Sequence, residues 1–481
     1  MAVVPVAPEY GSIKPSQKQQ LLESNYLDFT NGTNDFAQQY LPEIYEAEVE
    51  RYGNRTLSGF LRMVGAEMPM TSDQVVWSEQ NRLHIAYNDV TKATETTLTF
   101  ALSATAGPSF VANVISKRQT LVVIDPATGQ DLKVFVTDSV NTSATLATIT
   151  VKPYTAADMT ALSATAGALK IFVYGSEYKK GTTDSDIKSV TPSFTQYSNS
   201  PIIIKEKYSI SGSDTAQIGW VEVATEAGAS GYLWYLKAES ETRLRFEDYL
   251  EMSVVEGELV SGTSTLAADG YKGTEGLFAA IQSRGNVINN FTAVGGLGSF
   301  DNILKNLDTQ GAIEENMLFL NRQTSLDFDD MLAGLSAGAN GGTAYGLFEN
   351  SEEMALNLGF TGFRRGSYDF YKTDWKYLND ASTRGATNGA GEVGSGIDGV
   401  LVPAGTSTVY DQILGTNIRR PFLHVRYRAS QADDRRMKSW LTGSVGGAYT
   451  SDLDAMEVHF LSERCLVVQA ANNFVLFTAS A

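Results

Sequence analysis

Residues 231–251 read GYLWYLKAESETRLRFEDYLE, and no glycine or proline interrupts the interior of this stretch. That composition predicts one straight helix about 30 Å long, at ~1.5 Å per residue. Four leucines fall near one side of the helix and form a narrow apolar stripe: Leu233, Leu236, Leu244 and Leu250. We therefore expect this helix to lie across the protein and to meet neighbouring molecules through its charges.

Opposite charges four residues apart cover much of this helix, a spacing that stabilises helices. The expected pairs are Glu239–Arg243, Glu241–Arg245 and Arg243–Glu247. Two interpretations stay open at this point. The charges form contacts with neighbouring molecules, or they form a solvated helix face held by its own pairs.

The chain before this helix, from about 73 to 212, has the alternating pattern of β-strands. Apolar runs at 119–124 and 132–136 flank the turn DPATGQ at 125–130, which predicts a hairpin. Further strands are predicted at 148–151 and 170–174. The segment from about 90 to 178 is therefore expected to form a small all-β module within a longer β excursion.

The first ~35 residues are polar and carry Pro5, Pro8 and Pro15, a composition that predicts an extended arm. Met1–Tyr10 lacks the basic and apolar regions of a signal peptide, so we expect none. No apolar run approaches the roughly 20 residues that a membrane helix needs.

Three shorter helices are predicted after the long one, from capping residues and apolar spacing. They follow Thr274, Ser299 and Ser325, and between the last two Met317–Leu320 predicts a central strand because it is apolar on both faces. The chain then ends in predicted strands at 422–427, 457–461, 465–468 and 474–477, the last two joined by a hairpin at 470–473. This combination indicates compact α/β packing followed by a terminal sheet.

The formal net charge is −18, and no basic run appears in the sequence. Nucleic-acid binders concentrate Lys and Arg to displace counterions, so the composition argues against sequence-specific DNA or RNA binding. The one cysteine, Cys465, lies in an apolar run and is read as a core residue. Because one thiol cannot close an internal disulfide, a reducing cytosol is the expected site of synthesis.

No catalytic sequence pattern in the chain has the neighbouring elements that it requires. Residues 389–394 match a dinucleotide fingerprint, but loop residues surround them where a strand and a helix are required. The three histidines all fall in predicted strands without metal-ligand spacing: His84, His424 and His459. Asp327, Asp329 and Asp330 are read as first-turn partners of a helix dipole. We expect no catalytic residue, no cofactor and no metal.

The order of elements resembles the Hong Kong 97-type fold of tailed-phage major capsid proteins. In that family an N-terminal arm and an extended E-loop reach over neighbours, a spine helix crosses the subunit, and P- and A-domains follow. The similar stretches are 67–80 and 199–214 for the two ends of the E-loop, 234–251 for the spine helix, and 371–378 and 454–477 for the core domains.

The resemblance implies an α+β fold with an all-β insertion in the E-loop. Its expected divisions are a 1–60 N-terminal arm with a short helix, a 61–212 E-loop region including the insertion at about 90–178, a 213–337 spine helix and P-domain with the start of the A-domain, a 338–430 A-domain with Gly-rich loops, and a 431–481 C-terminal helix and β-sheet that return to the core domains. The expected subunit-interface residues are Trp77, Glu79 and Arg82 in the E-loop, and Glu239, Arg243, Arg245 and Glu247 on the spine.

The resemblance also implies a structural role without enzymatic activity: self-assembly into an icosahedral shell around the phage genome. The expected partners are further copies as hexamers and pentamers, portal, scaffolding and decoration or auxiliary proteins, and double-stranded DNA enclosed without sequence-specific contacts. The location would be the virion, assembled in the host cytoplasm, with no membrane partner. On this view, Arg243→Glu with Arg245→Glu leaves a soluble fold but abolishes particles.

Three alternatives remain from the sequence. A bacterial encapsulin shell would share the architecture and enclose a cargo enzyme. An extracellular β-rich fibre or adhesive protein would fit the Thr/Ser/Ala-rich strands. A hydrolase would use two carboxylates that meet only in the folded chain.

Overall fold

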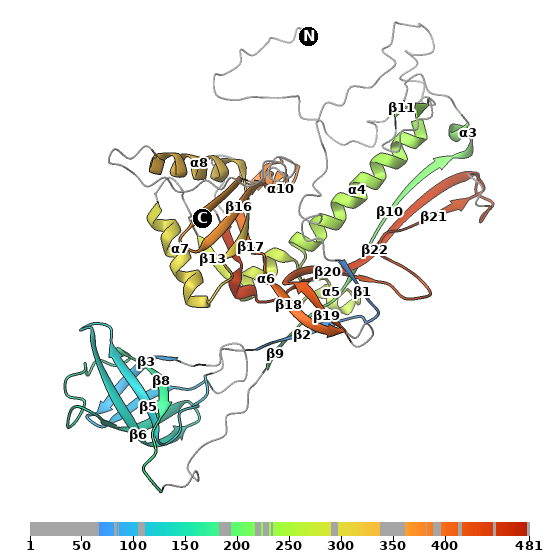
Figure 1. The fold of residues 1–481 in the computed structure, drawn as a ribbon. Helices are drawn as coiled ribbons and strands as arrows, with labels where there is room; N and C mark the ends of the chain where they lie inside the picture. The colour runs from blue at the N-terminus through green and yellow to red at the C-terminus, as the bar shows by residue number, and fades with distance from the viewer. Residues whose placement is uncertain are drawn as a thin grey trace. The chain divides into compact units, whose positions relative to one another are not determined.

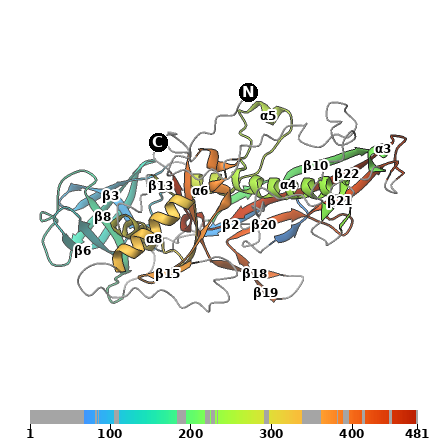
Figure 2. The same ribbon diagram turned by 90° about the horizontal axis from the view of Figure 1, so that it is seen from above.

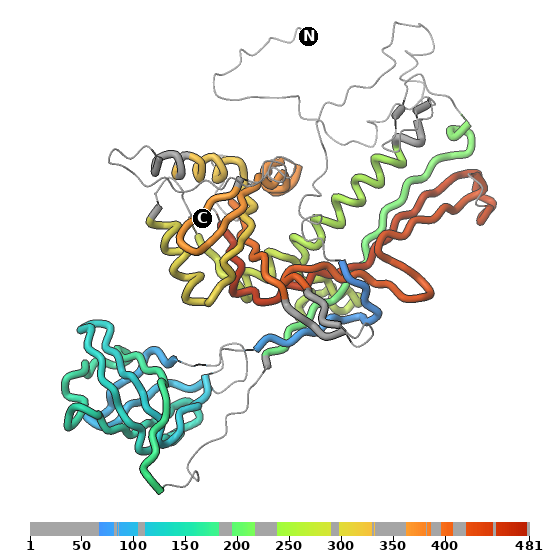
Figure 3. Tube along the Cα trace, in the orientation of Figure 1, coloured from blue at the N-terminus to red at the C-terminus, as the bar shows by residue number. Residues whose placement is uncertain are grey.

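The computed structural model describes residues 67–80, 84, 86–103, 111–181, 194–216, 223–224, 230–231, 234–289, 297–336, 361–380, 382–387, 396–411, 416–445 and 449–478. Figure 3 traces these residues in colour. The chain divides into two compact units, Val76–Ser198 and the remainder, Met1–Val75 with Asn199–Ala481. The predicted arm at 1–60 lies outside the described residues.

The smaller unit contains a closed six-stranded barrel in the order β3-β4-β7-β6-β5-β8 (Figure 1). Its strands are β3 (Ala86–Thr94), β4 (Thr97–Ala101), β5 (Gln119–Asp125), β6 (Gln130–Ser143), β7 (Leu146–Pro153) and β8 (Leu169–Ser176). Alternating residues such as Leu121, Val123 and Ile149 fill its interior because successive side chains point to opposite faces of a strand. The all-β segment predicted at about 90–178 and its hairpin at 125–130 are confirmed.

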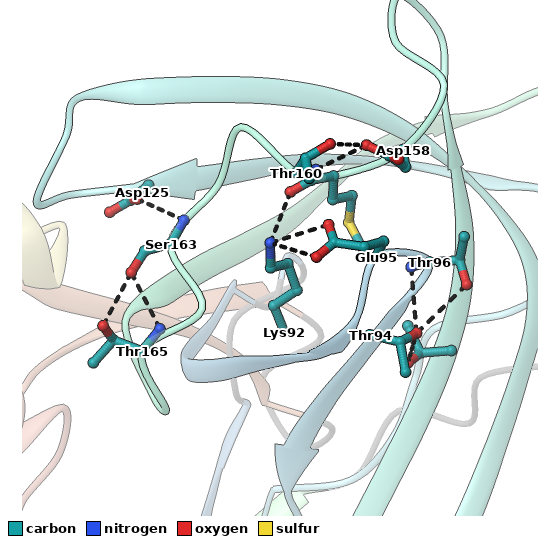
Figure 4. Close-up of polar contacts among 11 residues, drawn as sticks. Lys92, Thr94, Glu95, Thr96, Asp125, Asp158, Thr160, Ser163 and Thr165 are labelled. Atoms are coloured by element: carbon teal, nitrogen blue, oxygen red, sulfur yellow. Dashed lines mark hydrogen bonds and ion pairs between the residues drawn. The ribbon is translucent and has the colours of Figure 1, made fainter.

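The loop between β7 and β8 is fastened to the barrel by buried polar groups (Figure 4). The Lys92 ammonium donates to the Met159 carbonyl at 3.1 Å and forms an ion pair with Glu95 at 3.1 Å. The buried Asp125 carboxylate accepts a hydrogen bond from the Ser163 amide at 3.1 Å. These contacts satisfy charges that would be costly to bury alone, and they hold the loop in one position.

The larger unit contains a sheet organised by one strand, β22 (Ala455–Val468). Along one edge, β22 pairs with β10 (Ile202–Ser211). Its other edge is shared between β21 (Lys438–Gly443) and β20 (Leu423–Arg428), and β1 (Glu67–Met70) adds to β20 in parallel. The segments predicted as separate strands at 457–461 and 465–468 are therefore one strand with three partners.

The long helix predicted at 231–251 is present as α4 (Trp234–Glu256), and it continues to Glu256. Figures 1 and 2 show it running along β10 and β22. One row of its buried positions recurs every four residues: Ala238, Thr242, Phe246, Leu250 and Val254. The predicted leucine stripe was wrong at Leu244, which is half-buried, because the ridge that packs on the sheet passes through Thr242 and Phe246 instead.

The larger unit also contains a six-stranded mixed sheet in the order β13-β23-β17-β14-β16-β15. Its strands are β13 (Asn286–Asn289), β23 (Val475–Thr478), β17 (Ile397–Pro403), β14 (Glu315–Leu320), β16 (Tyr368–Asp374) and β15 (Thr361–Arg365). The predicted central strand is confirmed as β14. Phe319 packs into the core that contains α6 (Leu277–Arg284), whereas Leu318 and Leu320 pack toward α7 (Leu297–Gln310) and α8 (Arg322–Ser336) on the opposite face.

The predicted caps of the three shorter helices were wrong. Gly276 precedes α6, while the buried Thr274 hydroxyl hydrogen-bonds Asn199. Ser299 lies inside α7. Asn321 caps α8 by accepting the Thr324 amide at 2.7 Å, which places the three aspartates beyond the first turn. The partner of Asp329 is therefore the buried Lys372 ammonium rather than the helix dipole.

Two predictions for the C-terminus were also wrong. The residues at 465–468 and 474–477 do not form a hairpin, because β22 and β23 belong to different sheets and a short 3-10 turn (Ala471–Asn473) connects them. In the described part of 431–481 there is no α-helix. Instead, the Arg435 carbonyl accepts the Glu463 amide, and the Arg436 carbonyl accepts the Ser462 hydroxyl. This segment therefore lies along the edge of β22.

Candidate subunit interface

An open groove of about 480 Å³ lies between α4 and β21. Glu239 and Arg243 line it from the helix, and Trp440 and Leu441 line it from the strand. Trp440 is 36% exposed and Leu441 42% exposed. Among the described strands, β21 pairs only with β22, so its other edge has no partner among them. An open edge with exposed apolar side chains is typical of a surface that another chain covers.

The four predicted charges on α4 separate into two groups. Arg243 forms an ion pair with Glu247 at 3.3 Å, and its side chain is 61% exposed. Glu239 and Arg243 both reach the groove. Arg245 instead forms an ion pair with Glu206 on β10. The role of Arg245 in this chain is thus to fasten the helix to its own sheet, a contact that the sequence spacing did not reveal.

The predicted interface residues near the start of the excursion lie on β2 (Val75–Gln80), which pairs with β9 (Phe194–Asn199). Trp77 is 8% exposed, and its indole donates to Glu79 at 3.0 Å. Its ring centroid is 6.2 Å from that of Tyr197. This indole therefore stabilises the two-stranded ribbon, and Arg82 lies outside the described residues.

A network of arginines and acids fixes β1 to the sheet, and sequence reasoning missed it. Glu463 is almost fully buried and forms ion pairs with Arg428 at 2.8 Å and Arg435 at 3.0 Å. Glu67 at the start of β1 forms ion pairs with Arg436 and Arg464. The adjacent pair Arg435–Arg436 is the sequence signal that could have indicated this network.

The end of α4 is joined to the six-stranded sheet by another charged cluster. Glu256 accepts hydrogen bonds from the Tyr377 hydroxyl at 2.6 Å and from the Arg384 guanidinium at 2.6 Å. Burial and the neighbouring Glu256 carboxylate raise the pKa of Tyr377 above its usual value. The phenol therefore remains a donor at every physiological pH, and it fixes the helix end relative to the sheet.

A chain reversal between β21 and β22 presents an exposed aromatic residue. Tyr449 is 82% exposed and has a φ of 37°, a left-handed conformation that is costly for a residue with a side chain. Leu453 on the same reversal is 56% exposed. This reversal is a second candidate contact with neighbouring molecules.

The described histidines do not form a reactive site. His84 lies in an exposed bend before β3, so its predicted strand position was wrong, whereas His424 and His459 lie in β20 and β22 as predicted. Within the described ranges, no group of three His, Cys, Asp or Glu side chains gathers with metal-binding geometry. Nor is any helix there long and apolar enough to cross a membrane. The fingerprint at 389–394 falls outside those ranges.

His424 makes stability depend on pH. It is 1% exposed, and burial lowers its pKa from about 6.5 to about 4. The folded state therefore requires the neutral ring, so this contribution is complete above pH 6.5 and is lost as the pH falls toward 4. Between pH 7 and 5 the loss is about 2 kcal/mol. Urea titrations at pH 7 and pH 5 would measure this. Between these pH values, the free energy of unfolding should fall by about 2 kcal/mol less for His424→Leu than for the wild type. An equal fall for both proteins would contradict this.

No family model matches the sequence. No curated protein matches it either. Among solved structures, one from Microbacterium phage Oxtober96 is similar at 9% identity and a TM-score of 0.39, over 93% of this chain and 99% of that one. One from Gordonia phage Cozz is similar at 9% identity and a TM-score of 0.38, over 96% and 98%.

A third similar structure is titled "Capsid structure of the Cyanophage P-SCSP1u", at 8% identity and a TM-score of 0.33, over 64% of this chain and 80% of that one. Because the likeness is loose, a function for this chain has to be supported by its own architecture.

Proposed function

We propose that this chain is a major capsid protein of a tailed bacteriophage with the Hong Kong 97-type fold, and that it assembles into the icosahedral shell around the genome. The observation that carries the proposal is α4, one unbroken 23-residue helix along a sheet whose strands come from both ends of the chain. An open groove lies beside the helix.

The elements take the following roles in the proposal. The β2–β9 ribbon is the E-loop, and the barrel is an insertion in it. α4 is the spine helix, and the sheet around β22 is the P-domain. The six-stranded sheet is the A-domain, so this domain draws on residues 286–320, 361–403 and 475–478 rather than on one continuous segment.

The partners proposed for the shell are hexamers and pentamers of this chain, portal, scaffolding and decoration proteins, and enclosed double-stranded DNA. Many modest contacts between copies would give the closed shell its stability by multivalency. The shell would be assembled in the host cytoplasm and remain in the virion. The proposal assigns no catalytic role to any residue.

Arg243→Glu tests the proposal at the groove. Reversing this charge should leave a soluble, folded protein, because Arg243 is exposed and its ion pair with Glu247 is of the weak exposed kind. Particle yield in electron micrographs should fall at least about tenfold, since each small loss recurs at every copy in the shell. Changing Arg245 as well would confuse the result, because that residue pairs with Glu206 inside the chain.

Arg243→Lys is the matched control, because it retains the charge and should retain particles. Normal shells from Arg243→Glu would contradict the role of the groove, and a wild-type protein that forms no particles would contradict the proposed function. The contents of purified particles distinguish a phage capsid from an encapsulin, because a phage shell encloses DNA and an encapsulin encloses a cargo enzyme. Elongated particles would indicate a fibre protein.

A further inference from the structure

Strand β21 lies at the edge of its sheet, and no described strand covers its outer side (Figure 1). Its end shows which way its backbone groups point. The Ser444 amide donates to the Ala455 carbonyl on β22 at 3.1 Å, while the Gly443 carbonyl accepts the Thr450 amide at 2.8 Å on the outer side. Antiparallel pairing alternates these directions, and the register of β21 is unbroken. Its even-numbered residues therefore point their N–H and C=O groups to β22, and its odd-numbered residues point theirs outward.

Two residues of β21 thus present backbone groups to the outer side with no partner there among the described residues, Ser439 and Leu441. Each offers one N–H and one C=O. Gly443 is already occupied, because Thr450 bonds both its carbonyl and its amide. The middle of the strand carries no proline, bulge or charge, the features that normally protect an edge from pairing. This edge is therefore suited to receive another strand.

The two faces of β21 carry different side chains. Leu441 is opposite Val458, which packs with Phe246 of α4, so Leu441 lies on the helix side of the sheet. Trp440 is opposite His459, and the two rings stack with centroids 5.1 Å apart on the other side. The stacked imidazole holds the indole in place, so a partner strand meets a fixed ring.

We propose that β21 pairs antiparallel with β21 of a second copy of this chain across a twofold axis, so that the two sheets become one. The axis is perpendicular to the sheet and passes between the two copies of Trp440. In this register Ser439 is opposite Leu441 of the other copy, and the outward groups of both strands form four hydrogen bonds. A register centred on Leu441 would instead place Ser439 opposite Gly443, whose groups Thr450 already occupies. The inference rests on the proposed function and names the partner at the groove.

The charges of the groove are complementary under the same axis. Glu239 and Arg243 are one turn apart on α4, and both line the groove beside Ser439 and Leu441. The axis keeps both helices on one side of the joined sheet and reverses their direction, so each Glu239 is opposite Arg243 of the other copy. The two β22 strands are three strand spacings apart, about 14 Å, so the helices leave a gap that long charged side chains fill. This reciprocity favours a second copy over an unrelated strand.

The charges are tested in full-length protein by particle yield in electron micrographs. Glu239→Arg alone should lower the yield about tenfold, as Arg243→Glu should, because each variant places like charges opposite one another across the axis. Glu239→Arg combined with Arg243→Glu should recover the yield to within about twofold of the wild type, because the exchange restores both pairs. A double variant as poor as the single variants would overturn the proposal, since an unrelated occupant of the groove gains nothing from the exchange.

A disulfide tests the register. Trp440→Cys places two thiols across the axis in a pair whose Cα atoms are about 4.5 Å apart, a separation that a disulfide can bridge. Oxidised particles of this variant should therefore give covalent dimers on a non-reducing gel. Leu441→Cys is the matched control: the position is adjacent and similarly exposed, but in this register its two copies are more than about 7 Å apart, too far for a disulfide. The native Cys465 is buried and does not interfere.

The outcomes separate the pairing from the proposed function. If the wild-type chain forms no particles, the proposed function itself fails. If particles form but Trp440→Cys gives no covalent dimers, or Leu441→Cys gives as many, the pairing alone is refuted. If Trp440→Cys itself prevents assembly, the charge exchange between Glu239 and Arg243 decides.

Discussion

Phe246→Ala is expected to lower the free energy of unfolding by about 4 kcal/mol, the range found for a fully buried phenylalanine. The ring has no exposed surface and stacks on Phe460 with centroids 5.8 Å apart. Phe246 also packs with Leu250, Met456 and Val458, so the cavity would open in the centre of the contact between α4 and β22. Urea denaturation followed by circular dichroism would measure the loss.

The control for this prediction lies on the same helix. Tyr249 is 40% exposed, and Tyr249→Ala should change the free energy of unfolding by less than about 1 kcal/mol. If both variants lose the same stability, the helix does not pack on the sheet through Phe246. Phe246→Ala should also abolish particles, because a helix that detaches from its sheet no longer forms the groove with β21.

Glu463→Ala is the second large expected effect, at about 3 kcal/mol. This buried carboxylate forms ion pairs with Arg428 and Arg435, and its removal leaves two guanidinium groups without their shared counter-charge. Arg428 would keep Asp73, which is more exposed, so the loss falls at the lower end of the range for broken buried pairs. Thermal unfolding of the purified variant would test this.

Asp433→Ala is the comparison for Glu463. Asp433 also forms an ion pair, with Lys438 at 2.8 Å, but both side chains are about two-fifths exposed. An exposed pair of this kind contributes about 0.5 kcal/mol, so the variant should unfold close to the wild type. A Glu463→Ala protein as stable as Asp433→Ala would show that the network does not hold β1 in place.

Sequence patterns predicted the elements whose signals are local. The charge spacing of Arg243 and Glu247 indicated the long helix, and the alternation on both sides of 125–130 indicated a hairpin of the barrel. Partner choice between distant strands has no such signal. The runs at 465–468 and 474–477 looked like a hairpin because they are close in sequence, yet they belong to different sheets, although Leu466 and Leu476 share one core.

The candidate interface was partly predictable for the same reason. Glu239 and Arg243 could be identified as charges on a helix, but their groove depends on Trp440 and Leu441, which β22 brings from nearly 200 residues away. Arg245 was predicted to contact neighbouring molecules, because its partner within the chain, Glu206, lies 39 residues earlier on another element. The Glu463 network could not be recognised before the pairing of β1, β20 and β22 was known.

The pairing of β22 has a consequence for synthesis on the ribosome. Ser211 is opposite Ala455, so β10 and α4 emerge long before the strand that completes their sheet. All six barrel strands lie within 86–176, so the barrel has every partner it needs early in translation. Folding of the nascent chain therefore occurs in two stages, with the apolar side of α4 uncovered until β22 leaves the ribosome.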